Sequence, residues 1–129
     1  MIKNISLCFV FFAAISLIPN VSSAQPADTT GIYNPEYPAT IETEYMKSKL
    51  SLDSATASSV YNINLKYEKR NQQILTSKIN NAEKFRALQL SSQTRDAEMK
   101  SVLTKEQYNK YMAIKKDMMN TVKDKLKKK

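Results

Sequence analysis

The sequence contains no histidine and no tryptophan, and only one cysteine and one glycine among its 129 residues. Without histidine, and with Cys8 close to the N-terminus, the chain lacks the usual neutral-pH general base, thiolate nucleophile and transition-metal ligands. Because Gly31 is the only glycine, the sequence has no glycine-rich loop of the kind that holds a phosphate. We therefore expect no enzyme, no catalytic residue, no metal site and no cofactor.

Residues 1–24 have the pattern of a cleavable secretory signal peptide. A single basic residue precedes an apolar run over 5–18, and small residues lead to a cleavage site after Ala24. This run is shorter than the about 20 residues that a transmembrane helix needs. A lipoprotein signal ending at Cys8 fits poorly, because the bulky Leu7 precedes that cysteine. The sequence thus predicts export and removal of Cys8 with the signal.

Cleavage would leave 105 residues, 19 of them basic and 12 acidic, with a net charge of +7. This length predicts one domain. The mature chain would have no cysteine, so packing, helix propensity or association must stabilise it without disulfides. We therefore expect a homodimer. The positive charge favours attraction to acidic surfaces.

Proline and glycine divide the remaining chain into two parts. Residues 25–39 hold three prolines and the glycine, which predicts a flexible arm. Residues 40–129 contain neither residue and are rich in helix-favouring Lys, Glu, Gln, Ala, Leu and Met. The sequence therefore predicts a single all-α domain over 40–129 with a lysine-rich C-terminal tail.

Helix-start signals divide this domain into four helices. Thr40, Asp53 and Thr104 are expected N-caps, and Asn80-Asn81 is expected to end one helix in a left-handed turn and to cap the next. The predicted helices cover about 41–49, 53–79, 82–101 and 104–126, in an open helical-hairpin arrangement. Apolar residues recur at helical spacing along one side of each of the three long helices. They are Val60, Ile63, Tyr67 and Ile74, then Phe85, Leu88, Met99 and Val102, then Tyr111, Met112, Met118, Met119, Val122 and Leu126.

The fourth helix begins with the strongest local motif. In Leu103-Thr104-Lys105-Glu106-Gln107 the threonine hydroxyl can accept a hydrogen bond from the amide of Gln107, whose side chain can reach back to the amide of Thr104. Leu103 can pack as a staple on Tyr108. A related unit precedes the second helix, where Leu52 and Asp53 are followed by threonine in place of glutamine.

The Leu-Thr-x-x-Gln unit resembles the LTxxQ signature of the Spy/CpxP family of small periplasmic helical proteins. Members carry two such motifs, and in this chain the copy at Leu52 is degraded. The signal peptide, the length, the basic charge and the glycine-free helices agree with the resemblance over about residues 40–125. It implies a periplasmic, curved helical cradle formed by an antiparallel homodimer.

The resemblance implies two different functions. Spy-like members bind unfolded chains without ATP, whereas CpxP-like members restrain an envelope-stress sensor. We expect a holdase-like protein that binds unfolded or aggregation-prone chains, and the alternative is a regulator that binds a membrane sensor. Nucleic acid is not an expected partner, because the chain is predicted to be exported.

Three groups of residues each have a structural and a functional interpretation. Methionines and tyrosines of the last helix can form core or an adaptable contact surface. Basic residues can form a solvated face or attract clients electrostatically. Lys123–Lys129 can be a solubilising helix end or contact anionic membrane weakly. The expected client-binding residues are Lys66, Lys69, Arg70, Lys84, Arg86, Arg95, Met112 and Met118, while Leu103, Thr104, Gln107, Leu52 and Asp53 are expected to organise the fold.

Overall fold

The computed structural model describes residues 34–128 and shows four α-helices in them, with no strand in that range. About 87% of these residues are helical, so the all-α prediction is confirmed. The signal peptide with Cys8 and the first part of the predicted arm lie outside the described residues. The helices are α1 (Glu36–Leu50), α2 (Ser54–Thr76), α3 (Asn81–Val102) and α4 (Lys105–Lys127).

Side-chain caps begin three of the four helices. Asp53 and Thr104 have extended backbone conformations, and their side chains accept hydrogen bonds from the third amide of the helix, as predicted. Asn80 does the same before α3, where Glu83 reaches back to the Asn80 amide and completes a second capping box. The sequence therefore specifies these starts through contacts only three residues apart.

The first helix begins earlier than predicted. It starts at Glu36, where Asn34 Oδ1 accepts a hydrogen bond from the Glu36 amide at 2.9 Å. Thr40, the expected N-cap, is inside the helix and donates its hydroxyl to the Glu36 carbonyl at 2.7 Å. Pro38 lies in the first turn, where a helix needs no amide donor, and its side chain is buried. The prediction of a flexible arm is thus wrong for residues 36–39.

The connection between α2 and α3 also differs from the prediction. The second helix ends at Thr76 instead of about Ile79, and Ser77 closes it with an extended backbone and hydrogen bonds to the Ile74 carbonyl. Asn80 is extended as well, so the expected left-handed turn is absent there. Among described non-glycine residues, only Ser51 has a positive φ, 53°, at the end of α1.

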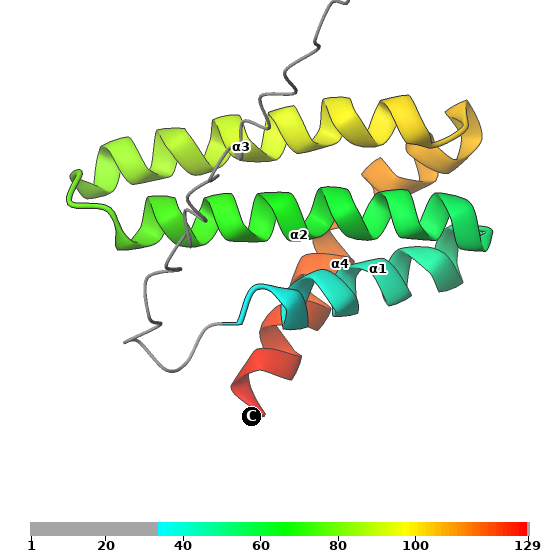
Figure 1. Cartoon of the computed structure of the whole chain (residues 1–129), viewed down its shortest axis with the longest axis horizontal. Helices are drawn as coiled ribbons and strands as arrows, with labels where there is room; N and C mark the ends of the chain where they lie inside the picture. The colour runs from blue at the N-terminus through cyan, green and yellow to red at the C-terminus, as the bar shows by residue number, and fades with distance from the viewer. Residues whose placement is uncertain (1–33, 129) are drawn as a thin grey trace, which may run out of the picture.

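Three helices form one layer and the fourth crosses it (Figure 1). The middle helix α2 packs against α1 on one side and α3 on the other, while α4 packs mainly against α1 and only slightly against α3. The hydrophobic core lies at the end of the layer that holds the α1–α2 and α3–α4 connections. Its buried members are Met46, Leu50, Leu52, Ala57, Val60, Ile63, Tyr67, Met99, Leu103, Tyr111 and Met118.

The opposite end of the layer contains only two helices. There α2 and α3 extend past the end of α1 and past α4, joined by the short loop before Asn80 (Figure 1). We call residues 70–90, which form this end, the hairpin arm. Among the described residues, no third helix covers the arm, and this arrangement decides which side chains face solvent.

Candidate interaction surfaces

The titratable groups with the largest pKa changes lie inside the helix interfaces. Burial raises the pKa of Glu42 to about 7, against the attraction of Arg95, and raises the pKa of Tyr67 to about 12. Within residues 34–128 no three Asp, Glu, Cys or His side chains gather in a group that could hold a metal ion. No helix in this range is both long and apolar enough to cross a membrane.

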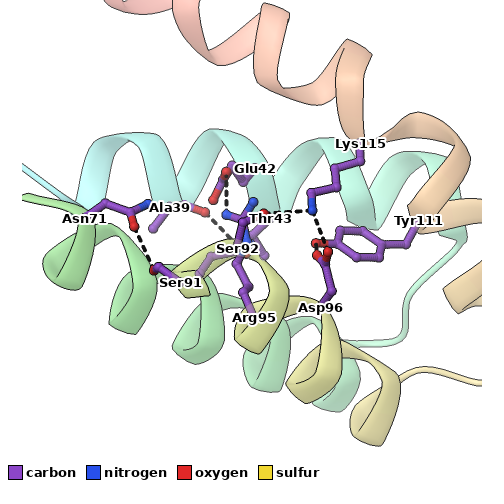
Figure 2. Close-up of polar contacts among 11 residues, drawn as sticks. Ala39, Glu42, Thr43, Asn71, Ser91, Ser92, Arg95, Asp96, Tyr111 and Lys115 are labelled. Atoms are coloured by element: carbon purple, nitrogen blue, oxygen red, sulfur yellow. Dashed lines mark hydrogen bonds and ion pairs between the residues drawn. The ribbon is translucent and has the colours of Figure 1, made fainter. Parts of the chain in front are cut away.

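A buried ion pair joins α1 to α3. Arg95 Nη1 donates to Glu42 Oε1 at 3.0 Å, and the two residues are 4% and 1% exposed (Figure 2). Glu42 Oε2 and Arg95 Nε have no hydrogen-bond partner within the described chain. The pair is thus incompletely compensated, which explains why burial dominates the pKa of Glu42.

A second polar cluster joins α3 to α4. Asp96 accepts a hydrogen bond from the Tyr111 hydroxyl at 2.7 Å and forms an ion pair with Lys115 Nζ at 2.6 Å (Figure 2). Lys115 Nζ also donates to the Ser92 hydroxyl at 2.9 Å. Burial is the main cause that raises the pKa of Tyr111, so this phenol stays protonated and remains a donor. These contacts fix where α4 crosses the layer.

The five motif residues organise the fold in the described structure. Leu52 and Leu103 are buried in the core immediately before their caps. Asp53 accepts from the Thr56 amide at 2.7 Å, and hydrogen bonds from Thr56 lower the pKa of Asp53. Both bonds of the predicted Thr104–Gln107 capping box are present, at 3.1 and 3.2 Å. The degraded first copy therefore keeps the buried leucine and the cap.

The expected basic surface is divided among different roles. Lys69, Arg70 and Arg86 are exposed. Lys66 is exposed but forms an ion pair with Glu98, which also accepts a hydrogen bond from Tyr67. Lys84 donates to the Leu75 carbonyl at 2.8 Å, at the end of α2, so it helps to close the hairpin. Among the expected basic residues, the exposed Lys69, Arg70 and Arg86 thus lie on α2 and on the hairpin arm.

Two of the expected client-binding residues are buried. Arg95 is held by Glu42 between α1 and α3, so its inclusion in an accessible basic surface is wrong. Met118 is fully buried in the core, whereas Met112 on the same helix is 46% exposed. The reason is geometric, because α4 turns one side toward α1 and leaves the neighbouring side to solvent. The last helix therefore provides both core and exposed surface.

The hairpin arm carries large apolar side chains whose exposure the sequence pattern did not predict. Phe85 is 62% exposed and Leu75 is 54% exposed, on α3 and α2 respectively. Ile79 in the connecting loop and Leu90 on α3 are also exposed. The arm also carries exposed basic residues, among them Arg70 and Arg86. It is thus a two-helix surface that combines large apolar groups with positive charge.

Periodicity alone leads to a different expectation for Phe85. Phe85 and Met99 are separated by two heptads, so the sequence pattern places them on the same side of α3. Met99 is fully buried in the core cluster, which includes Met46 of α1 and Met118 of α4. Phe85 belongs to the hairpin arm and is 62% exposed. The sequence signal that could have revealed the arm is length, since the predicted first helix was far shorter than the second and third.

A family model described as "Domain of unknown function (DUF4890)" matches residues 23–111. The chain belongs to the DUF4890 family. No curated protein and no solved structure matches it. In this DUF4890 protein the matched region includes α1–α3, the hairpin arm and both leucine-plus-cap units, whereas most of α4 follows the end of the match. The resemblance to the Spy/CpxP family stays a prediction.

Proposed function

We propose that this protein is an exported, ATP-independent holdase that binds unfolded or aggregation-prone chains through its hairpin arm. The observation that carries the proposal is the group of exposed apolar side chains on the arm: Leu75, Ile79, Phe85 and Leu90. Large apolar side chains that are exposed within one part of a molecule can mark a binding site, and these four lie within the 70–90 segment of the hairpin arm. The resemblance to Spy-like proteins, which bind unfolded chains without ATP, agrees with this function.

The arm offers two kinds of contact to such a chain. Leu75 and Phe85 provide apolar area that can cover exposed hydrophobic segments of a client. Arg70 and Arg86 provide positive charge that speeds encounters with acidic segments. Both groups are exposed before binding, so no rearrangement of the core is required and no nucleotide-driven step is needed. We propose the periplasm as the location.

The proposal is tested by suppression of aggregation with a roughly stoichiometric amount of the exported protein and several unrelated substrates. The double variant Leu75→Ser/Phe85→Ser is expected to lose most of the suppression. The matched control Met112→Ser/Met119→Ser removes two exposed apolar side chains from α4 instead and is expected to retain it. Suppression should also weaken as salt is added, because screening reduces the attraction of the basic residues.

Two outcomes would contradict the proposal. If the unaltered protein fails to protect any of the substrates, the holdase function is wrong, and the alternative of a regulator that binds an envelope sensor gains support. If both double variants lose suppression equally, the hairpin arm is not the binding surface. Circular dichroism of each variant should show unchanged helix content, since all four altered side chains are exposed.

A further inference from the structure

The outer side of α4 carries a second exposed apolar row, separate from the hairpin arm. Met112, Met119 and Leu126 are 46%, 36% and 37% exposed. They follow one another at intervals of seven residues, so they lie in one line along the helix axis. From Met112 to Leu126 this line is about 21 Å long at the rise of an α-helix. Tyr111, Met118 and Val122 occupy the neighbouring, buried side.

Charge is unevenly distributed around this helix. With 3.6 residues per turn, Tyr108 lies in line with the apolar row, and Lys115, which is ion-paired with Asp96, lies on one side of it. On the other side, four exposed lysines lie within about 80° of the row, while the acidic residues of α4 lie more than about 130° from it. The lysines are Lys105, Lys116, Lys123 and Lys127, and the acidic residues are Glu106, Asp117 and Asp124. Met112, Lys116, Met119 and Lys123 also border one shallow surface depression. We call the apolar row and these four lysines the α4 face.

We propose that the α4 face binds the surface of an anionic lipid membrane. An amphipathic helix binds at a membrane interface when an apolar row enters the headgroup region and lysines contact anionic lipids. Three apolar side chains provide little area, so the lysines must supply a large share of the attraction. Binding should therefore require anionic lipid. The contact begins with Lys105 and Met112, well before the lysine-rich tail.

A flat surface fits the α4 face better than an acidic polypeptide does. The row is straight and belongs to a single helix, so a plane can follow its length, whereas the depression beside Met112 and Met119 is wide open and offers no enclosing walls to a chain. The C-terminal part of α4 projects beyond α1 (Figure 1), and residues 123–128 are exposed. Long lysine side chains can also extend toward headgroups while their methylene groups cover apolar surface.

The experiment is cosedimentation of the exported protein with vesicles. One set contains phosphatidylethanolamine with about a quarter phosphatidylglycerol, and the other contains only phosphatidylcholine. We expect binding to the first set, weakening with salt, and little binding to the second. Met112→Ser/Met119→Ser should weaken binding several-fold, and Lys116→Gln/Lys123→Gln should weaken it about tenfold or more. These side chains are exposed, so the variants should keep the helix content of the parent.

The matched control is Lys69→Gln/Arg70→Gln, which removes the same charge from the exposed side of α2. This variant should bind vesicles far better than Lys116→Gln/Lys123→Gln. Equal losses from the two charge pairs, binding to neutral vesicles as strong as to anionic ones, or no vesicle binding would overturn the proposal. Capture by soluble polyglutamate without binding to vesicles would overturn it in favour of an acidic polypeptide. Met112→Ser/Met119→Ser separates this site from the holdase surface, since it should leave suppression of aggregation unchanged.

Discussion

Replacing Glu42 with glutamine is expected to remove a pH dependence of the folding stability. The ordinary pKa of this carboxyl, which applies in the unfolded chain, is 4.5, and burial raises the pKa in the folded protein to about 7. The folded protein therefore holds a proton that the unfolded chain releases between these two values. Its contribution to the free energy of unfolding is fully present below about pH 4.5 and is lost as the pH rises through about 7. The interval between the pKa values corresponds to roughly 3 kcal/mol.

Burial determines the sign of this effect, and the charged groups that face Glu42 modify its size. Arg95 and Lys115 lower the pKa of Glu42 and Glu68 raises it, but burial has the largest influence. Arg95 remains charged throughout the relevant range, since its own pKa is raised. The pKa of Glu98 and that of Asp53 are lowered, so these carboxylates lose stabilising contacts only at a more acidic pH. Between about pH 5 and 8, Glu42 should dominate.

Urea denaturation followed by far-ultraviolet circular dichroism measures this effect at several pH values. The unaltered protein should become less stable by roughly 2–3 kcal/mol between about pH 5 and 8, and Glu42→Gln should be nearly independent of pH. A free energy of unfolding that stays constant or rises over this range in the unaltered protein would refute the reasoning. The same slope in both proteins would show that another group titrates.

Arg95→Met should lower the free energy of unfolding most at about pH 8, by about 3–5 kcal/mol, because it leaves the buried carboxylate of Glu42 unpaired. In urea denaturation, adding Glu42→Gln to this variant should restore much of the lost stability. Thr104→Ala should lower the free energy of unfolding by about 1 kcal/mol, while the control Thr40→Ala, inside α1, should change it little; equal effects would contradict the assigned caps. Ser51→Gly should raise the free energy of unfolding by up to about 1 kcal/mol, and with it the urea midpoint, because Ser51 has a left-handed conformation that glycine adopts readily. A lower midpoint would argue against this helix end. Mass spectrometry of the exported protein should find Gln25 at its N-terminus, and an intact N-terminus would exclude the cleavage site.

The sequence predicted the helix starts well where the information is local. A cap such as Thr104 and its partner Gln107 are three residues apart, so their bond depends on little else. Prediction failed for the start of α1, because Pro35 and Pro38 were interpreted as helix breakers although a first turn accepts proline. The left-handed turn predicted at Asn80 is absent, because Asn80 has an extended conformation and acts only as the N-cap of α3.

The candidate surfaces were less predictable, because exposure depends on where other helices end. A basic residue such as Arg95 usually faces solvent. Here it is buried, because it pairs with Glu42 on α1, which lies 53 residues earlier in the chain. Met112 and Met118 differ only in their direction around α4, which a broad apolar stripe does not resolve. Phe85 lies on the same side of α3 as the buried Met99, but no helix of the described structure covers it. Three-dimensional information was required in each case.

The position of the core separates the residues that stabilise this fold from the proposed binding surface. Met99 and the capped start of α4 lie in the four-helix end, whereas Leu75 and Phe85 lie on the two-helix arm. Replacing an already exposed side chain with serine costs little folding stability, so residues of the arm can be changed without unfolding the core. Conversely, the ion pair of Glu42 and Arg95 can change stability with pH while the arm keeps its exposed apolar groups. The two properties should therefore respond independently to substitution, which allows one to be altered while the other serves as the control.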